Sequence, residues 1–232
     1  MIWWHGVSSD DVNVIVERCP GITIPNRQIE RVPIKGRNGD LVISHGAYEN
    51  VIQPYEIYIS AEAPRLLNIV HRVSEWLMVK GYQRLEDSYS LDYFRLATYD
   101  GGTDIESILG RFGRATINFN CKPQRFLKIG DVLRTMSKGK ILINPTPEEA
   151  APLLMVSGSG SGTVSIGDKT LTLTDCDGVT IDCDVMQVYR GSENLNSTAS
   201  GDWLKIPGSA SVAITWSGGV SGVAMKPRWW TV

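Results

Sequence analysis

The chain has no histidine after His71, and its only cysteines are the widely separated Cys19, Cys121, Cys176 and Cys183. Imidazole is the usual proton shuttle near neutral pH and the most common zinc ligand, so its absence disfavours acid–base catalysis and zinc binding over most of the chain. The cysteines show no Cys-x-x-Cys spacing, which predicts free thiols in a reducing compartment. We therefore expect no catalytic residue, no bound metal and no cofactor.

The sequence also lacks an excess of basic charge and a long apolar run. Its 23 Lys and Arg residues nearly balance 25 Asp and Glu residues, leaving a formal net charge of -2. The long-range attraction that nucleic-acid binders use is therefore missing, and sequence-specific nucleic acid binding is not expected. Polar residues interrupt the apolar stretch 66–79, which falls short of the roughly 18 apolar residues that a membrane span needs. The start of the chain has no secretory-signal pattern, and no membrane association is expected.

What is present points to two domains of mainly β structure. A length of 232 residues accommodates two domains of the common size of about 100–150 residues. The composition changes near Lys138, and an Asn144-Pro pair beyond it predicts an extended connector. We predict an α+β domain with antiparallel sheets and one helix over residues 1–137, followed by a β-sandwich over residues 138–232.

The first domain contains one helical pattern and one hairpin pattern. Apolar residues recur at three- and four-residue steps over 66–77, which predicts an amphipathic helix with Trp76 as a core anchor. The Asn-Gly pair at 38–39 suits a two-residue turn, which would place Ile34 opposite Ile43. We expect this hairpin to project from the domain.

The second domain is predicted to consist of short strands at 152–156, 163–166, 169–174, 179–185, 211–216 and 222–225. The Ser-Gly run at 157–162 resembles a phosphate loop, but no Gly-Lys-Ser/Thr follows and the next segment is a strand, so we interpret it as a flexible turn. A three-residue loop at 176–178, with Gly178 left-handed, would align Leu173 with Ile181 in a hairpin.

Candidate residues for catalysis are present but carry no signature. His5, His45 and His71 stand outside any recognisable Ser-His-Asp motif. Carboxylates such as Asp40 and Glu86 would have to be brought together by the fold to act on a glycosidic bond, and nothing in the sequence singles out a pair. A non-enzymatic protein is the expectation, with a wall-degrading hydrolase as the third hypothesis.

Aromatic stacking on sugars is the more serious alternative. Trp203, Trp216, Trp229 and Trp230 fall in the second domain, and an indole face packs well on the apolar side of a sugar ring. Trp216 ends an alternating apolar strand and is expected in the core. The other three are better placed for exposure or for a subunit contact.

Several motifs occur together along the chain: Val32 to Leu41 with its Gly-Arg-Asn-Gly-Asp core, Ile117-Asn118-Phe119-Asn120-Cys121-Lys122-Pro123-Gln124-Arg125-Phe126, Ile143-Asn144-Pro145 leading to Ala151-Pro152 and the Ser-Gly run, Ile181-Asp182-Cys183-Asp184, Gly201-Asp202-Trp203-Leu204 with Ile206-Pro207-Gly208, and Ile214-Thr215-Trp216-Ser217-Gly218. In this order they resemble the distal tail protein (Dit) family of siphophages. The resemblance covers most of the chain, whereas each motif alone is weak.

The resemblance implies a structural virion protein at the phage tail tip, assembled in the host cytoplasm. Residues 1–137 would form a six-membered ring that continues the tail tube, and residues 138–232 a galectin-like β-sandwich. The implied partners are further copies of the chain in a homo-hexamer, the tail tube protein, the tape measure protein and tail-associated tip or baseplate proteins. The projecting hairpin would reach a neighbouring copy.

One departure from the galectin pattern bears on function. Galectins usually recognise sugar with a histidine, asparagine and arginine set beside a tryptophan, and this second domain contains no histidine. We therefore interpret it chiefly as a docking surface for baseplate components. The alternative is a carbohydrate-binding adhesion module on the tail tip that contacts host cell-surface carbohydrate.

Overall fold

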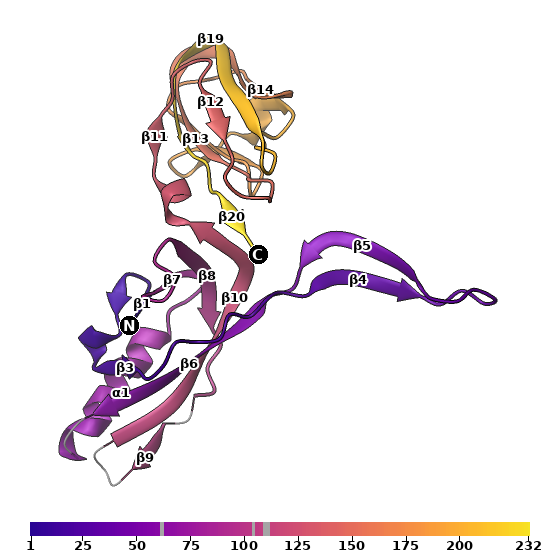
Figure 1. Cartoon of the computed structure of the whole chain (residues 1–232). Helices are drawn as coiled ribbons and strands as arrows, with labels where there is room; N and C mark the ends of the chain where they lie inside the picture. The colour runs from indigo at the N-terminus through magenta and orange to yellow at the C-terminus, as the bar shows by residue number, and fades with distance from the viewer. Residues whose placement is uncertain (61–62, 104, 109–111) are drawn as a thin grey trace. The chain divides into compact units, whose positions relative to one another are not determined.

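The structure is a computed structural model that describes residues 1–60, 63–103, 105–108 and 112–232. The chain divides into two compact units, Met1–Arg125 with Val232 and Phe126–Thr231 (Figure 1). Strands predominate, and α1 is the single α-helix among the described residues, which confirms the predicted mainly β class. The boundary placed near Lys138 from composition stays a prediction, as does the galectin-like character of the second domain.

The elements that begin in the first unit are β1 (Ile2–Trp4), β2 (Val7–Ser8), the 3-10 helix η1 (Asp10–Val12), β3 (Val14–Val16), β4 (Arg27–Val32), β5 (Leu41–Tyr48), β6 (Val51–Ser60), α1 (Ala63–Leu77), β7 (Gln83–Asp87), β8 (Tyr93–Tyr99), β9 (Glu106–Ile108) and β10 (Phe112–Leu127). The main sheet has the order β2-β1-β7-β8-β10-β6-β3, and β9 pairs with β10. Strands β1, β3, β6 and β7 pair with their neighbours in antiparallel fashion, and Ile117 of β10 lies opposite Tyr55 of β6.

Helix α1 packs on the buried face of this sheet. Along β6, Tyr55, Ile57 and Ile59 are buried because alternate residues of a strand face the same side. From the helix, Val73 and Trp76 join the same apolar cluster. Both the helix and the role of Trp76 as a core anchor are therefore confirmed.

The elements of the second unit are η2 (Lys128–Asp131), β11 (Arg134–Thr135), β12 (Ile141–Ile143), β13 (Leu153–Ile166), β14 (Lys169–Leu173), β15 (Val179–Asp182), β16 (Gln187–Arg190), β17 (Glu193–Asn194), η3 (Asn196–Thr198), β18 (Ala199–Gly201), β19 (Ser211–Lys226) and β20 (Trp230–Thr231). Two long strands, β13 and β19, pair from Leu153 opposite Lys226 to Ile166 opposite Ile214, with two register shifts between. The first half of β13 also pairs with β15, and the second half with β14. The sheet thus bends in the middle of β13 and β19, and its two halves enclose one core.

The Ser-Gly run forms this bend, so its interpretation as a flexible turn is wrong. Residues 157–162 lie inside β13, where the register with β19 shifts twice. A Cβ built on Gly158 would lie 2.2 Å from the carbonyl oxygen of Gly219, and one on Gly219 would lie 1.7 Å from that of Ser159. Glycine is needed here because two backbones approach too closely for any side chain.

The hairpin predicted around residues 176–178 is also wrong. Gly178 is left-handed as expected, with φ of 62°, but β14 and β15 each pair with β13 and lie on its two different halves. Sequence alternation fixes which residues of a strand share a face, but not which strand lies beside it. Cys176 and Cys183 are both buried free thiols, and burial raises the pKa of Cys183 to about 12.

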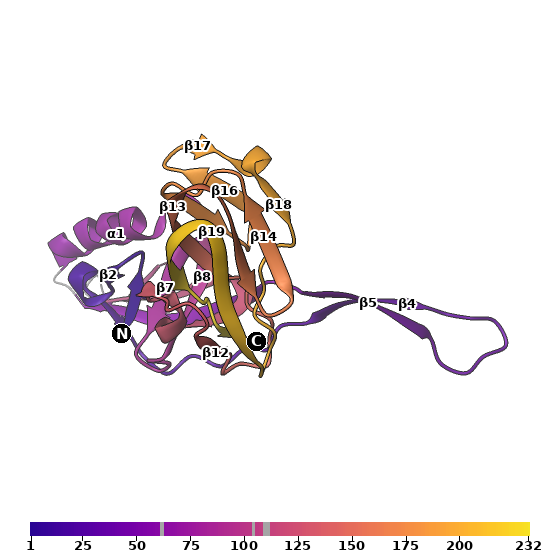
Figure 2. The same ribbon diagram turned by 90° about the horizontal axis from the view of Figure 1, so that it is seen from above.

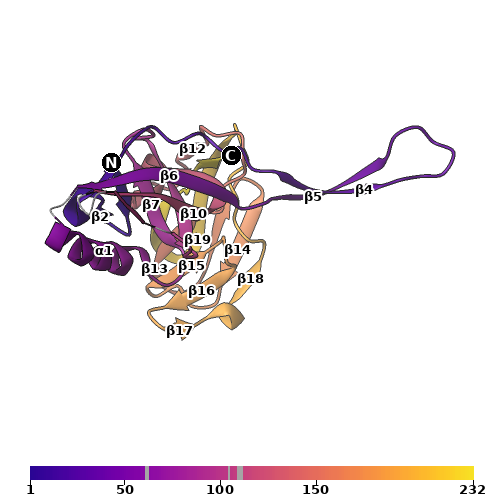
Figure 3. The ribbon, with the colours of Figure 1, turned by 90° about the horizontal axis from the view of Figure 1, so that it is seen from below.

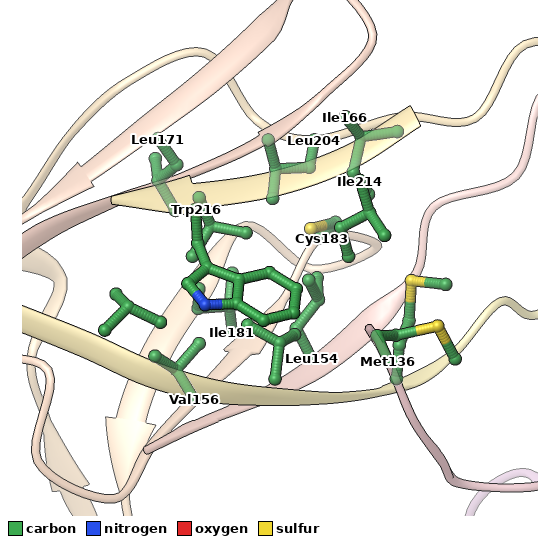
Figure 4. Packing of buried hydrophobic residues seen from close by; sticks show 14 of the residues in the cluster. Met136, Leu154, Val156, Ile166, Leu171, Ile181, Cys183, Leu204, Ile214 and Trp216 are labelled. Atoms are coloured by element: carbon green, nitrogen blue, oxygen red, sulfur yellow. The ribbon is translucent and has the colours of Figure 1, made fainter. Parts of the chain in front are cut away.

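Side chains from both halves of the bent sheet form the core of the second unit. Figure 4 shows the Trp216 ring with Leu154 and Val156 on one side and Leu171 on the other. Trp216 is buried, as predicted. Trp229 is buried in the same cluster, so its expected exposure is wrong.

Candidate interaction surface

Strands β4 and β5 form a two-stranded sheet of their own, which we call the arm (residues 27–48). Figures 2 and 3 show the two strands side by side with no third strand next to them. The last pair of the ladder is Val32 opposite Leu41, so the tip loop comprises residues 33–40. The projecting hairpin is therefore confirmed, whereas the two-residue turn at 38–39 is wrong.

The wide tip loop has a local cause. Pro33 has no amide hydrogen, so it cannot continue the ladder as a donor. Gly36 and Gly39 both adopt a φ of 83°, a conformation that suits glycine in a wide loop. As a result, Ile43 lies opposite Glu30 and the predicted pairing of Ile34 with Ile43 does not form.

The arm exposes large apolar side chains on both of its faces. Cross-strand partners lie on the same face of a sheet, as do residues two positions apart in one strand. Leu41 and Ile43 therefore share one face of the arm, together with their partners Val32 and Glu30. The opposite face carries Ile29 and Val42. These four side chains are exposed by 43%, 40%, 37% and 52%, respectively.

Such an isolated hairpin gains little stability from its own contacts. Two strands without a third strand or a covering helix are marginally stable in water. Their outer edges present unpaired backbone groups, and clustered exposed apolar side chains are typical of interaction sites. The arm is therefore the strongest candidate for a surface that becomes ordered against another protein chain.

The histidines and carboxylates considered for catalysis do not form a common site. His5 follows β1 and its Nε2 lies 3.1 Å from the Trp76 carbonyl oxygen, whereas His45 is exposed on the arm and His71 is exposed on α1. Asp40 lies in the tip loop of the arm, and Glu86 lies on β7. The fold therefore offers no support for a Ser-His-Asp set or a carboxylate pair built from these residues.

Two motifs that carried the family resemblance meet in the second unit. The buried Asn144 donates through Nδ2 to the carbonyl oxygens of Ile206 (3.3 Å) and Pro207 (3.2 Å). Its Oδ1 accepts hydrogen bonds from the backbone amide (3.0 Å) and the hydroxyl (2.7 Å) of Thr146. The backbones at Gly208 and Pro147 also pack closely beside this asparagine. A Cβ on Gly208 would lie 1.9 Å from the carbonyl oxygen of Pro147. These motif residues fasten the fold rather than form a reactive site.

A further motif residue, Asp182, forms a two-point ion pair with Arg228. The Nη1–Oδ1 distance is 2.6 Å and the Nη2–Oδ2 distance is 2.9 Å. Burial opposes ionisation of the carboxyl group, but the hydrogen bonds and positive charge of Arg228 outweigh it and lower the pKa of Asp182. The pair links the end of β15 to the segment between β19 and β20.

The second unit offers a limited aromatic surface. Trp203 and Trp230 are only partly buried but pack against the core, and Trp230 Nε1 donates to the carbonyl oxygen of Glu149 at 2.9 Å. With Trp229 buried, the three indoles expected at the surface do not form an open stacking platform. No specific contact therefore favours the sugar-binding alternative.

Two further features concern metals and membranes. No group of three His, Cys, Asp or Glu side chains that could hold a metal ion occurs among the described residues. In that same part of the chain, no helix is long and apolar enough to cross a bilayer.

Comparison with known proteins gives the class to which this fold belongs. It is the fold of phage distal tail proteins, which confirms the resemblance drawn from the motifs at the level of structure. One matching structure is the crystal structure of the SPP1 Dit (gp 19.1) protein, described as a paradigm of the hub adsorption apparatus in phages infecting Gram-positive bacteria. The match has a TM-score of 0.74 and 11% identity and covers 100% of this chain and 98% of that chain. A scan against protein-family models and a search of curated proteins found no match.

Proposed function

We propose that the chain is a structural phage tail protein, the distal tail hub that joins the tail tube to the adsorption apparatus. The observation that carries this proposal is the full-length similarity of its fold to the SPP1 Dit protein. The hub would be a six-membered ring formed by the first domain, located in the virion at the tail tip. It would act without catalysis and without a cofactor.

In this proposal the arm holds the ring together. A closed ring needs a head-to-tail contact, in which one surface of each copy fits a different surface of the next. The arm is suited to such a contact because its apolar side chains are exposed and the outer edges of β4 and β5 pair with no further strand of their sheet. Burial of these side chains against a neighbouring copy would supply roughly 25 cal/mol per Å² of apolar surface removed from water.

The proposed partners follow from the position of a hub. One side of the ring would contact the tail tube protein and the tape measure protein, and the other the tip or baseplate proteins. The second domain would serve as a docking surface for baseplate components. Assembly in the host cytoplasm agrees with the free thiols of the chain.

The experiment is a comparison of assembly between the wild type and an arm variant, Ile29→Asp combined with Val42→Asp. Both residues lie on one exposed face of the arm, so the variant should keep the stability of the isolated protein while losing self-association. Light scattering gives the mass in solution, and negative-stain microscopy shows whether rings with a central channel form. Ile143→Asp, a change of the same kind at a residue 68% exposed in the second unit, is the control and should assemble normally.

Two results would contradict the proposal. One is a wild-type protein that forms no ring at any concentration, with or without the tail tube protein. The other is an arm variant that assembles as well as the wild type, which would remove the arm from the ring contact.

A further inference from the structure

The first unit contains a cavity of about 120 Å³ that sequence analysis gave no reason to expect. Its lining comes from the first half of β6, the end of β7, the start of β8, Arg125 of β10, and residues 19–22 after β3. Aromatic side chains, among them Tyr93 and Phe94, form part of its wall.

Arg95 is the unusual residue of this cavity. Its side chain lines the cavity although the residue is only 9% exposed, and its Nη1 atom has no hydrogen-bond partner. A buried guanidinium group remains charged and carries donors that all require acceptors. Leaving such a charge without a counter-ion is costly, so buried arginines are normally paired.

The carboxylate of Asp87, which lines the cavity, already accepts several hydrogen bonds. Asp87 Oδ2 accepts a hydrogen bond from the Tyr55 hydroxyl (2.9 Å), and Oδ1 accepts from the backbone amides of Tyr89 (2.9 Å) and Ser90 (2.8 Å). Burial, followed by the charge of Asp87, raises the pKa of Tyr55, so the phenol stays a donor. Asp87 therefore compensates the charge of Arg95 only at a distance.

The charges around the cavity do not balance. Arg125 is a second guanidinium group in the lining; it donates to Ser90 Oγ at 2.9 Å and lies over the Tyr93 ring at 4.7 Å. The other acidic residue of the lining, Glu86, is in an ion pair with Arg84. The two arginines of the lining are thus balanced only by the charge of Asp87, which leaves an excess of positive charge.

We propose that this cavity is a carboxylate-binding site, in which Arg95 and Arg125 hold the carboxylate and the aromatic wall contacts the apolar carbon next to it. A planar carboxylate matches the fork of N–H donors that a guanidinium group presents. The volume suits a group of a few heavy atoms, since about 10–15 Å³ of such space is enough to hold one water molecule. The same chemistry is offered by a small free carboxylate and by an acidic side chain of another protein chain.

The site does not depend on the proposed tail function, because it rests on contacts within one unit. It can be tested on the purified full-length protein with acetate as the probe. Side-chain nitrogen NMR follows the Nε–H signals of the arginines, and a thermal melt follows stability. Sodium chloride at equal ionic strength separates specific binding from salt screening.

We expect acetate to shift the Arg95 signal saturably at millimolar concentrations and to raise the melting temperature of the wild type. Arg95→Met should abolish the acetate-dependent rise in melting temperature while leaving the acetate-free protein as stable as the wild type or more so, because an unpaired buried charge is removed. Arg125→Gln should weaken acetate binding about tenfold. The control is Arg114→Met, which removes an exposed arginine paired with Glu17 outside the cavity and should bind acetate like the wild type.

The source of the natural carboxylate is read from the same signals. A shift of the Arg95 signal that grows with protein concentration and is displaced by acetate would assign the group to an acidic side chain of a second copy. A response to acetate alone would assign it to a free small carboxylate. The proposal is overturned if the wild-type signal of Arg95 does not respond to acetate, or if Arg95→Met folds and keeps the acetate-dependent rise in melting temperature. Should Arg95→Met not fold, the wild-type titration and Arg125→Gln still decide the question.

Discussion

The arm and the second unit are built from the same kinds of residue, but the apolar side chains are exposed in the arm and buried in the second unit. Leucine, isoleucine and valine occur in the strands of both. In β13 and β14, Leu154, Leu171 and Leu173 are at most 1% exposed, whereas Leu41 and Ile43 of the arm are exposed by at least 40%. The β-branched residues of these segments therefore predict a strand in either case. Only the presence of a second layer decides whether that strand stabilises the chain by itself or waits for a partner.

The largest loss of stability is expected in the second unit, from the addition of a single methyl group. Gly219→Ala should destabilise it by at least about 4 kcal/mol, because the added Cβ would lie 1.7 Å from the carbonyl oxygen of Ser159. Hydrogen exchange of β13 peptides measures this loss without assuming that both units unfold together. Gly222→Ala on the same strand is the control, since its Cβ would meet nothing within 4 Å. Equal protection of both variants would contradict the prediction.

A core truncation sharpens the contrast. Leu154→Ala should cost about 3 kcal/mol, because Leu154 is completely buried and its removal leaves a cavity between the two halves of the sheet. The change in unfolding free energy of the second unit, measured by the same exchange experiment, tests this value. A cost below about 1 kcal/mol would mean that the two halves do not pack tightly on each other.

The ion pair between Asp182 and Arg228 adds a smaller, pH-dependent contribution. Asp182→Asn should lower the stability of the second unit by about 2 kcal/mol at neutral pH. Because the folded-state pKa of Asp182 is lowered, its contribution is present above the unfolded value of about 3.9 and is lost as the pH falls through the folded value. Thermal melts between pH 7 and pH 2 should therefore converge for the two proteins at the acid end. Curves that stay parallel would show that the pair does not contribute.

The smallest effect is expected in the arm. Leu41→Ala makes the same kind of change as Leu154→Ala, but it should change the stability of the isolated protein by less than about 0.5 kcal/mol. Chemical denaturation of the monomeric protein measures this difference. A large loss would show that the arm packs on its own chain, and the contrast between the two regions would disappear.

Local pattern was enough to predict the helix around Trp76 and the existence of the projecting hairpin. It failed where the outcome depends on segments that are distant in sequence. The loop at 176–178 has the glycine of a tight turn, but β13 separates the strands on either side of it. The Ser-Gly run has the composition of a flexible loop, and only the approach of β19 turns it into a bent strand.

The candidate interaction surface was predicted only in part, again because local pattern does not show which distant segments meet. The hairpin motif located the arm, but its register followed from Pro33 and the two loop glycines rather than from the Asn-Gly pair. Arg95 carried no local signal, because an arginine in an alternating strand resembles any solvent-facing residue. Its burial becomes visible only when β7, β8 and β10 lie next to one another.

The pairing of β13 with β19 has a consequence for biogenesis. Leu153 lies opposite Lys226, so the central ladder joins segments from opposite ends of the second unit. While the chain is still being synthesised, the edge of β13 that pairs with β19 remains unpaired until β19 has left the ribosome. Folding of this unit should therefore be late and slow, as is typical of structures dominated by non-local contacts. Truncated nascent chains that stop before β19 should be the form most sensitive to proteases and most dependent on chaperones.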